Sequence, residues 1–339
     1  MTSILVAGDY FILPELFESA VRRGAPADAD LSFRHFRTPW PRVPFGDVAE
    51  VTEASGSEDE MIAALQGMDL IVANHAPLTA RVIENTRLSF AVAARGGATN
   101  VNLAAARAAG LRVSNAPGRN AAATAEHSVA MMLAALRRIP ESDAELRQGT
   151  WRGDFYEYEK SGGELGAARV GLIGFGQIGA RVARIVRGFG AEVGIYDPYA
   201  DAGVEQYGKR FASLEALLGW STIVSLHARA TAETRNMIDA RALALLPRGA
   251  VLVNCARGSL VDEAALCDAL ASGQLGGAAL DVFAHEPLSP GDPLLAAPNL
   301  VITPHIAGAS RETALLAAQM AGEEVGRYLR GEPLRHEIT

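Results

Sequence analysis

Short apolar runs alternate with segments of helical pattern through the first third of the chain. Each run has the length of a buried strand, and turn residues or a helical segment separate it from the next. The runs lie at residues 3–6, 31–36, 69–74, 88–94 and 111–115. Strands that alternate with helices in this way predict a compact parallel α/β domain.

The predicted helices of this domain have recognisable ends. Ser57 and Glu60 have the spacing of a capping box, in which each side chain bonds the other residue's backbone N–H, so a helix should begin there. Further helices are expected at residues 79–85 and 102–110. Three prolines between residues 37 and 50 predict a loop.

A second series of apolar runs begins near residue 169. Its predicted strands lie at residues 170–173, 193–196, 221–227, 251–254, 277–283 and 300–303. Six parallel strands complete the two mononucleotide-binding halves of a Rossmann-type, doubly wound sheet. Between the two series, the apolar spacing of residues 121–148 predicts one long helix, and residues 151–163 lack periodicity and predict a loop.

The last helical segment, residues 311–330, is expected to return to the first domain. The chain then crosses between domains twice, near residues 118 and 306. The predicted fold class is therefore α/β, with a Rossmann-type doubly wound domain inserted into a second, flavodoxin-like α/β substrate domain. The expected ranges are 119–305 for the dinucleotide-binding domain and 1–118 plus 306–339 for the substrate domain.

The stretch from residue 169 to Asp197 has the pattern of a strand, a glycine turn, a helix and a second strand. Gly174 allows the turn, Gly176 lets the backbone approach a pyrophosphate, and Gly179 lets the helix pack on the strand. Asp197 lies where a carboxylate would bond an adenosine ribose and repel the extra phosphate of NADP. NAD is therefore favoured, and NADP is not excluded. The alternative is an ordinary βαβ unit without a ligand.

Composition narrows the possible partners. The 339 residues suffice for two domains, and a net charge of −8 leaves no basic excess for nucleic acid. The sequence contains no uncharged apolar run of about 18 residues, so no membrane span is predicted. The cysteines, Cys255 and Cys267, lack metal-ligand spacing and are too few for a disulfide framework, so we expect no metal and a cytoplasmic location. The first residues predict a strand rather than a signal peptide.

Three polar residues follow strands of the second series, where ligands of doubly wound sheets bind. His305 suits a general acid/base with a pKa near neutrality, Glu286 suits a carboxylate that orients it, and Arg257 suits a planar substrate carboxylate. Together they fit hydride transfer at a carbon that bears oxygen. Each has a simpler alternative: His305 is a capping or surface residue, Glu286 a turn acid, and Arg257 a solvated lead-in to the next helix.

Five other histidines compete with His305. They are His35, His75, His127, His285 and His336. Only His75, at the end of the predicted strand 69–74, is expected to face a ligand.

Four ordered motifs resemble those of the D-isomer-specific 2-hydroxyacid dehydrogenases, a family that includes D-3-phosphoglycerate dehydrogenases. They are Asn115–Asn120 followed by Ala125-Glu126, Asn254–Gly258, Asp281–Pro287 and Pro304–Ala307. The resemblance implies an oxidoreductase that acts on the CH–OH group and interconverts a D-2-hydroxy acid and its 2-keto acid. It also implies that Arg257 binds the substrate, that His305 is the acid/base paired with Glu286, and that the protein is a homodimer formed through the cofactor domains.

The resemblance also assigns binding residues. The implied cofactor contacts are Gly174, Gly176, Gln177, Ile178, Gly179, Asp197, Pro198, His227, Ala228, Thr231, Cys255, Ala256, Asp281, Gly308 and Thr124. The expected substrate-binding residues, besides Arg257, are Arg95, Gly96 and Gly97. Asn74 and His75, which are unusual for the family, are also expected to bind the substrate, at a polar tail.

The sequence departs from the family pattern in two loops. The segment Arg95–Asn102 is shorter than usual and lacks an acid, and Arg229 adds a cation that could meet a 2′-phosphate. These departures leave the named substrate open. A second hypothesis is an NAD-sensing, non-enzymatic binding protein like the corepressors that resemble this family, although no peptide-binding extension is recognised. The length is expected to leave no room for the regulatory domain of some phosphoglycerate dehydrogenases.

Overall fold

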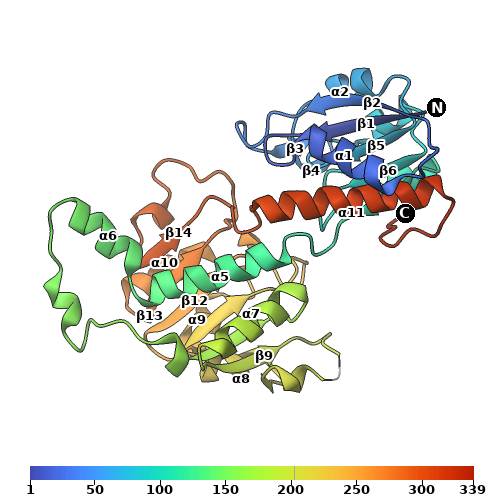
Figure 1. The fold of residues 1–339 in the computed structure, drawn as a ribbon. Coiled ribbons are helices and arrows are strands. Elements are labelled where there is room, and N and C mark those ends of the chain that lie inside the picture. The colour runs from blue at the N-terminus through green and yellow to red at the C-terminus, as the bar shows by residue number, and fades with distance from the viewer. Residues whose placement is uncertain (202) are drawn as a thin grey trace. The chain divides into compact units, whose positions relative to one another are not determined.

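A computed structural model describes residues 1–201 and 203–339 and divides them into two compact units. Unit 1 comprises residues 1–120 and 309–339, and unit 2 comprises residues 121–308. Each unit is built on a parallel sheet with helices packed on it (Figure 1), so the predicted α/β class is confirmed. Among the described residues, no helix is both long and apolar enough to cross a membrane.

The sheet of unit 1 has the strand order β2-β1-β5-β6-β7, with every neighbouring pair parallel. This is the flavodoxin-like order of a doubly wound sheet. Its strands are β1 (Thr2–Gly8), β2 (Leu31–Arg37), β5 (Leu70–Ala73), β6 (Phe90–Ala93) and β7 (Arg112–Asn115). All five predicted strands are present. The predicted loop 37–50 is wrong in part, because β3 (Gly46–Val48) pairs with β4 (Val51–Ala54) in a separate hairpin.

Five helices belong to unit 1. They are α1 (Pro14–Gly24), α2 (Glu58–Leu65), α3 (Ala80–Glu84), α4 (Leu103–Ala108) and α11 (Arg311–Leu329). The capping box of Ser57 and Glu60 opens α2 as predicted. α11 lies along α1 (Figure 1), and the two backbones meet at glycines: a Cβ on Gly24 would lie 2.3 Å from the carbonyl oxygen of Gly322.

The sheet of unit 2 has the order β10-β9-β8-β11-β12-β13-β14, again parallel throughout. Its strands are β8 (Arg169–Ile173), β9 (Glu192–Tyr196), β10 (Lys209–Arg210), β11 (Ile223–Leu226), β12 (Ala250–Asn254), β13 (Leu275–Leu280) and β14 (Leu300–Ile302). The six predicted strands are present in a Rossmann-type arrangement, and the two-residue β10 was missed. β13 ends at Leu280, so Asp281 lies just beyond its carboxyl end.

The helices of unit 2 cover both faces of this sheet. The α-helices are α5 (Ala121–Leu136), α6 (Ile139–Arg147), α7 (Gln177–Gly188), α8 (Leu214–Trp220), α9 (Ala240–Leu245) and α10 (Glu263–Ala271). Short 3-10 helices are η1 (Gly153–Tyr156), η2 (Leu165–Ala167), η3 (Val204–Gln206), η4 (Gly258–Leu260) and η5 (Pro293–Ala296).

The single helix predicted over 121–148 is wrong, because the chain breaks between α5 and α6. Arg138 has a φ of 50°, in the left-handed region, and Pro140 follows in the first turn of α6. A proline there cannot continue the hydrogen bonds of the preceding helix. α5 buries its alanine and methionine face in the unit, whereas α6 buries none of its residues.

Candidate active site

The glycine turn after β8 is shaped by close backbone contacts. Gly174 has a φ of 91°, and a Cβ there would lie 2.6 Å from the backbone nitrogen of Ala228. A Cβ on Gly179 would lie 2.5 Å from the carbonyl oxygen of Gly174. A Cβ on Gly176 would meet no atom within 4 Å, so the space before the N-terminus of α7 is open. Two glycines thus pack the turn and the third leaves room, which fits a pyrophosphate.

Asp197 follows β9 and holds the glycine turn in place. Its Oδ2 accepts a hydrogen bond from the backbone N–H of Phe175 at 2.7 Å, and its Oδ1 accepts one from Tyr199 at 2.8 Å. The carboxylate therefore lies at the tip of the second strand, beside the turn. Its bond to a ribose stays a prediction.

His227 follows β11 and packs under the same turn. Its Cδ2 would lie 3.7 Å from a Cβ on Gly179, and its Nε2 is buried without a hydrogen-bond partner among the described residues. Burial lowers the pKa of His227 to about 4, so the ring is neutral at physiological pH. A neutral ring in this position supports the turn rather than exchanging protons.

The remaining predicted cofactor residues are spread over several elements of unit 2. Gln177 and Ile178 begin α7, Thr124 is buried in α5, and Thr231 lies in an exposed loop after β11; Cys255 and Ala256 follow β12, and Pro198 and Gly308 follow β9 and β14. Burial raises the pKa of the Cys255 thiol to about 12, so this cysteine is not a nucleophile at neutral pH.

His305 and Glu286 form a hydrogen-bonded pair. Nδ1 of His305 lies 2.6 Å from Oε2 of Glu286, whose Oε1 accepts from the backbone N–H of Phe283 at 2.9 Å. Burial alone would raise the pKa of Glu286, but the hydrogen bond and charge of His305, the Phe283 amide and the charge of Arg257 outweigh it. The pKa of Glu286 therefore lies below its ordinary value, and the carboxylate form is favoured.

Arg257 lies beside this pair because two loops meet backbone to backbone. A Cβ on Gly258 would lie 1.9 Å from the carbonyl carbon of Phe283, so only glycine fits there. Asn254 fixes the loop from inside, donating from Nδ2 to the carbonyl oxygen of Arg257 at 2.9 Å. Desolvation lowers the pKa of Arg257 and the charge of Glu286 opposes this, yet the side chain keeps access to solvent. A ligand can therefore reach the guanidinium.

Asp281 organises the loop that carries His305. The Asp281 side chain is fully buried, and its carboxylate accepts from the Thr303 hydroxyl at 2.6 Å and from the backbone N–H groups of Ile306 and Ala307 at 2.9 and 2.7 Å. His127 of α5 extends the network, with Nε2 3.1 Å from the Thr303 hydroxyl. The sequence did not single out Thr303 or His127 for this role, because only the fold brings them to the end of β13.

The predicted substrate residues of unit 1 gather at the carboxyl edge of its sheet. Nδ2 of Asn74 donates to Oδ2 of Asp9 at 2.7 Å, and the His75 ring lies 4.3 Å from Trp40 between ring centroids. Arg95 pairs with the carboxylate of Glu53 and also donates to its carbonyl oxygen at 2.9 Å.

The two predicted loop glycines lie next to Arg95. The carbonyl oxygen of Gly96 accepts a hydrogen bond from Nδ2 of Asn115 at 2.9 Å. A Cβ on Gly97 would meet no atom within 4 Å. Sequence reasoning missed Asp9, Glu53 and Arg119 at this edge. For Asp9 a signal existed, since it lies three residues beyond the first apolar run, at the end of the strand that the run predicts.

These observations define the class of protein. A flavodoxin-like unit is joined to a Rossmann-type unit whose glycine turn fits a dinucleotide, and an Arg, Glu and His cluster lies at the strand ends of that second unit. The model for the NAD binding domain of the D-isomer specific 2-hydroxyacid dehydrogenases matches residues 129–307. The chain belongs to this family, and unit 2 is its nicotinamide-cofactor domain.

Relatives of known name agree with this membership. The chain is 40% identical over 291 residues to a D-3-phosphoglycerate dehydrogenase of Mycobacterium tuberculosis, covering 85% of this chain and 54% of that protein. It is 37% identical over 283 residues to a glyoxylate reductase of Korarchaeum cryptofilum, covering 83% of this chain and 85% of that protein. The crystal structure of a Thermus thermophilus protein matches 100% of both chains with a TM-score of 0.82 at 31% identity. The chain thus spans about half the length of the phosphoglycerate dehydrogenases it matches.

Proposed function

We propose that this protein interconverts a D-2-hydroxy acid and its 2-keto acid with a nicotinamide cofactor. The observation that carries the proposal is the 2.6 Å contact between His305 and Glu286, with Arg257 beside it at the same strand ends. Family membership and the names of relatives such as the glyoxylate reductase support the same reaction class.

The three residues have separate roles in this chemistry. Because Nδ1 of His305 is held by Glu286, Nε2 is the atom that gives a proton to the substrate oxygen in reduction and takes it back in oxidation. The Glu286 carboxylate fixes the ring and stabilises its protonated form. Arg257 binds the substrate carboxylate through its planar fork of donors. The bound nicotinamide supplies the hydride chemistry.

Cofactor binding is assigned to the glycine turn and the residues around it. The open space at Gly176 and the free N-terminus of α7 support a pyrophosphate there. Asp197 supports NAD over NADP, because a carboxylate beside the ribose repels a 2′-phosphate. Arg229 is exposed in the loop after β11, and it is the cation that would favour NADP instead. Asp281 is assigned to the nicotinamide end in addition to its contacts with the His305 loop.

Substrate recognition beyond the reacting carbon is assigned to unit 1. Asn74, His75, Arg95, Gly96 and Gly97 all follow strands of its parallel sheet, and ligands of such sheets bind at that edge. The two cysteines and the net charge of −8 support a small-molecule enzyme of the cytoplasm.

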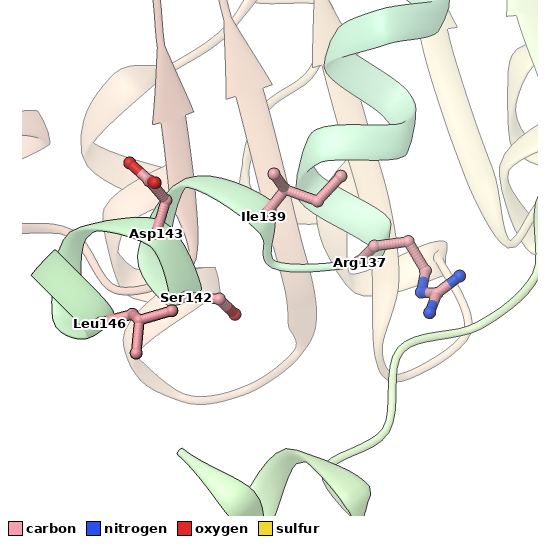
Figure 2. A pocket seen from close by; sticks show the side chains of 5 residues that line it. All are labelled: Arg137, Ile139, Ser142, Asp143 and Leu146. Atoms are coloured by element: carbon pink, nitrogen blue, oxygen red, sulfur yellow. The ribbon is translucent and has the colours of Figure 1, made fainter. Parts of the chain in front are cut away.

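We further propose a homodimer formed through unit 2, with the segment 139–158 as its contact. Large apolar side chains are exposed along it: Ile139, Leu146, Trp151, Tyr156 and Tyr158. Ile139 and Leu146 also line a hollow at α6, with Arg137, Ser142 and Asp143 (Figure 2). Large apolar side chains exposed together on one segment are typical of protein interfaces, and a second copy would bury these.

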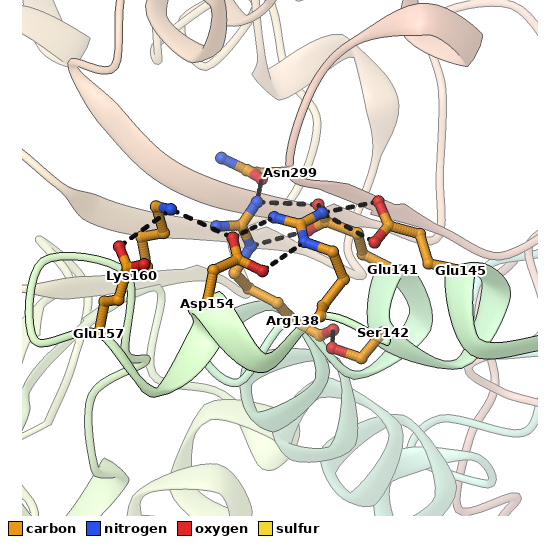
Figure 3. Close-up of polar contacts among 9 residues, drawn as sticks. Arg138, Glu141, Ser142, Glu145, Asp154, Glu157, Lys160 and Asn299 are labelled. Atoms are coloured by element: carbon orange, nitrogen blue, oxygen red, sulfur yellow. Dashed lines mark hydrogen bonds and ion pairs between the residues drawn. The ribbon is translucent and has the colours of Figure 1, made fainter. Parts of the chain in front are cut away.

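The same segment is held in shape by ion pairs (Figure 3). Arg152 pairs with Glu145 at 2.7 Å and with Asp154 at 2.8 Å, and Arg138 donates to Oδ1 of Asn299 at 2.8 Å. The Phe155 ring lies against both guanidiniums, 4.6 Å from that of Arg138 and 4.1 Å from that of Arg152. A preformed segment supports an interface, because little ordering is needed on association. Sedimentation of Trp151→Glu should show a smaller species than the wild type.

The decisive experiment is His305→Ala. Turnover of 2-keto acids should be abolished while NADH binding, followed by fluorescence, is retained, because His305 moves a proton and the glycine turn is untouched. Wild-type turnover in the variant would refute the assignment of the acid/base. A wild-type protein that binds NADH but turns over no 2-keto or 2-hydroxy acid would instead support a non-enzymatic sensor.

A further inference from the structure

A histidine that the proposed chemistry does not use lies beside the buried carboxylate of Asp281. Nε2 of His127, in the second turn of α5, is 3.1 Å from the Thr303 hydroxyl oxygen and 3.6 Å from Oδ1 of Asp281. In the described ranges 1–201 and 203–339, His127 is the one basic side chain within 4 Å of this carboxylate. Asp281 is fully buried, whereas the His127 side chain is 22% exposed. The ring therefore lies at the rim of the Asp281 network.

The hydroxyl of Thr303 determines which atom donates at each step of this network. It has one hydrogen and three acceptors around it: Oδ1 of Asp281 at 2.6 Å, Nε2 of His127 at 3.1 Å and the Met131 sulfur at 3.9 Å. The short bond to the carboxylate is the strongest of the three, so the hydrogen points to Asp281. The hydroxyl oxygen is then an acceptor toward His127, and Nε2 of the ring must carry a hydrogen. This holds for the neutral and for the protonated ring alike.

A donor at Nε2 of His127 keeps the Thr303 hydroxyl committed to Asp281. Without that donor the hydroxyl is free to rotate away, and the buried carboxylate loses one of its hydrogen bonds. The same carboxylate accepts from the two backbone N–H groups that directly follow His305. Hydrogen bonds in such a chain strengthen one another. His127 therefore acts, through Thr303 and Asp281, on the backbone that orients His305.

Packing of α5 holds the His127 ring in place. Thr124, three residues before it, and Met131, four residues after it, are both buried. Residues three and four apart share one face of a helix, so His127 lies on the face of α5 that packs on the sheet. Met131 also belongs to the same hydrophobic core as Ala307, whose N–H group Asp281 holds. The position of Nε2 is thus set by the core of unit 2.

We propose that His127 is a positioning residue for the acid/base step. It donates from Nε2 to Thr303 and thereby holds the Asp281 carboxylate in the arrangement that orients His305. The inference rests on the proposed function, because His305 is the group that it positions. In this assignment His127 neither carries the transferred proton nor binds the substrate. Its loss should therefore lower kcat and leave KM nearly unchanged.

The test removes the donor and keeps the shape of the ring. His127→Phe has no N–H group, so kcat should fall roughly 5-fold, the loss expected from one hydrogen bond of average strength. His127→Gln carries an amide N–H at a reach similar to that of Nε2 and should stay within about 2-fold of the wild type. His35→Phe, at an exposed histidine of β2, is the matched control and should change neither kcat nor KM. Steady-state kinetics use NADH and the 2-keto acid that the wild type reduces fastest.

A double-mutant cycle separates this chain of contacts from a general effect on packing. If His127 acts through Thr303, His127→Phe should cost less than about 2-fold in kcat in a Thr303→Val background. Losses that multiply in the double variant would overturn the proposed route. Equal losses in His127→Phe and His127→Gln would overturn the role of the donor. Should His127→Phe fold poorly in urea unfolding, His127→Leu takes its place.

Amide hydrogen exchange gives a readout that does not depend on turnover. Exchange at Ile306 and Ala307 should be faster in His127→Phe than in the wild type, and His127→Gln should restore the slow rate, because Asp281 holds both N–H groups. Unchanged exchange in folded His127→Phe would overturn the inference. If the wild type turns over no 2-keto acid, the proposed function fails, and exchange alone then decides whether His127 positions this loop.

Discussion

Asp281 holds the backbone immediately after His305 through two hydrogen bonds. Its two carboxylate oxygens accept from the N–H groups of Ile306 and Ala307 at 2.9 and 2.7 Å, while His305 itself has a φ of 54°. A non-glycine residue in this left-handed region is strained, and surrounding bonds must hold it there. The orientation of His305, the proposed acid/base, thus depends on a buried carboxylate 24 residues earlier in the chain.

Thr303→Val should lower kcat without a matching rise in KM. The Thr303 hydroxyl donates to Asp281 at 2.6 Å, so its loss leaves that buried carboxylate short of one donor and loosens the His305 loop. We expect a fall of roughly 10-fold, which corresponds to about 1.4 kcal/mol in the barrier. Thr303→Ser keeps the hydroxyl and should stay near wild type. Steady-state kinetics measure this, and equal losses in both variants would assign the effect to packing.

Gly258→Ala should both destabilise unit 2 and inactivate the protein. The added Cβ would lie 1.9 Å from the Phe283 carbonyl carbon, so the loops that carry Arg257 and Glu286 must separate. Overpacking typically costs about 1–3 kcal/mol, and a contact with fixed backbone places Gly258→Ala at the upper end. Gly176→Ala is the control: its Cβ would meet nothing within 4 Å, so stability should be nearly unchanged while NADH binding weakens. Urea unfolding and NADH titration separate these effects, and a stable, active Gly258→Ala would contradict the close contact.

Glu286→Gln should change both rate and acid stability. An amide holds the protonated His305 ring less well than a carboxylate, so kcat should fall by roughly 10- to 100-fold. The pKa of Glu286 is held below its ordinary value of 4.5. A depressed carboxyl pKa stabilises the fold fully above that value, and the contribution disappears as pH falls through the folded-state pKa. The stability difference between wild type and variant should therefore be constant from pH 7 to about pH 5 and shrink below. A pH-independent difference in urea unfolding would contradict this.

Much of the fold could be predicted from the sequence because its signals are local. The apolar runs of β1, β5 and β6 are bounded by turn residues, and the glycine turn before α7 is one short motif. The break between α5 and α6 also had a local signal in Pro140, but the alanine-rich spacing on both sides concealed it. β10 has two residues, too few for any periodicity.

The candidate site was predictable only in part, because sequence motifs identify residues but not the hydrogen-bond and packing partners that the fold gives them. Spacing and family pattern pointed to Arg257, Glu286 and His305, and the fold gathers them. The burial of Asp9, and of Nε and Nη1 of Arg119, is not given by one sequence: an arginine in a glycine and asparagine loop is ordinarily solvated. His127 is one of the competing histidines and lies far along the chain from Thr303, so only the packing of α5 on the sheet brings the two together.

Cofactor preference can be tested at Asp197 with little damage to the fold. Asp197→Asn removes the charge but keeps an oxygen that accepts the 2.7 Å bond from Phe175, so the glycine turn should persist. The wild type should prefer NADH, and the variant should gain roughly 10-fold in relative kcat/KM for NADPH, because the carboxylate no longer repels the 2′-phosphate. Arg229→Ala in the same background should reverse part of that gain if the cation meets the phosphate. A wild type that uses NADPH as well as NADH would contradict the role given to Asp197, and a loss of NADPH activity in Arg229→Ala alone would transfer that role to Arg229.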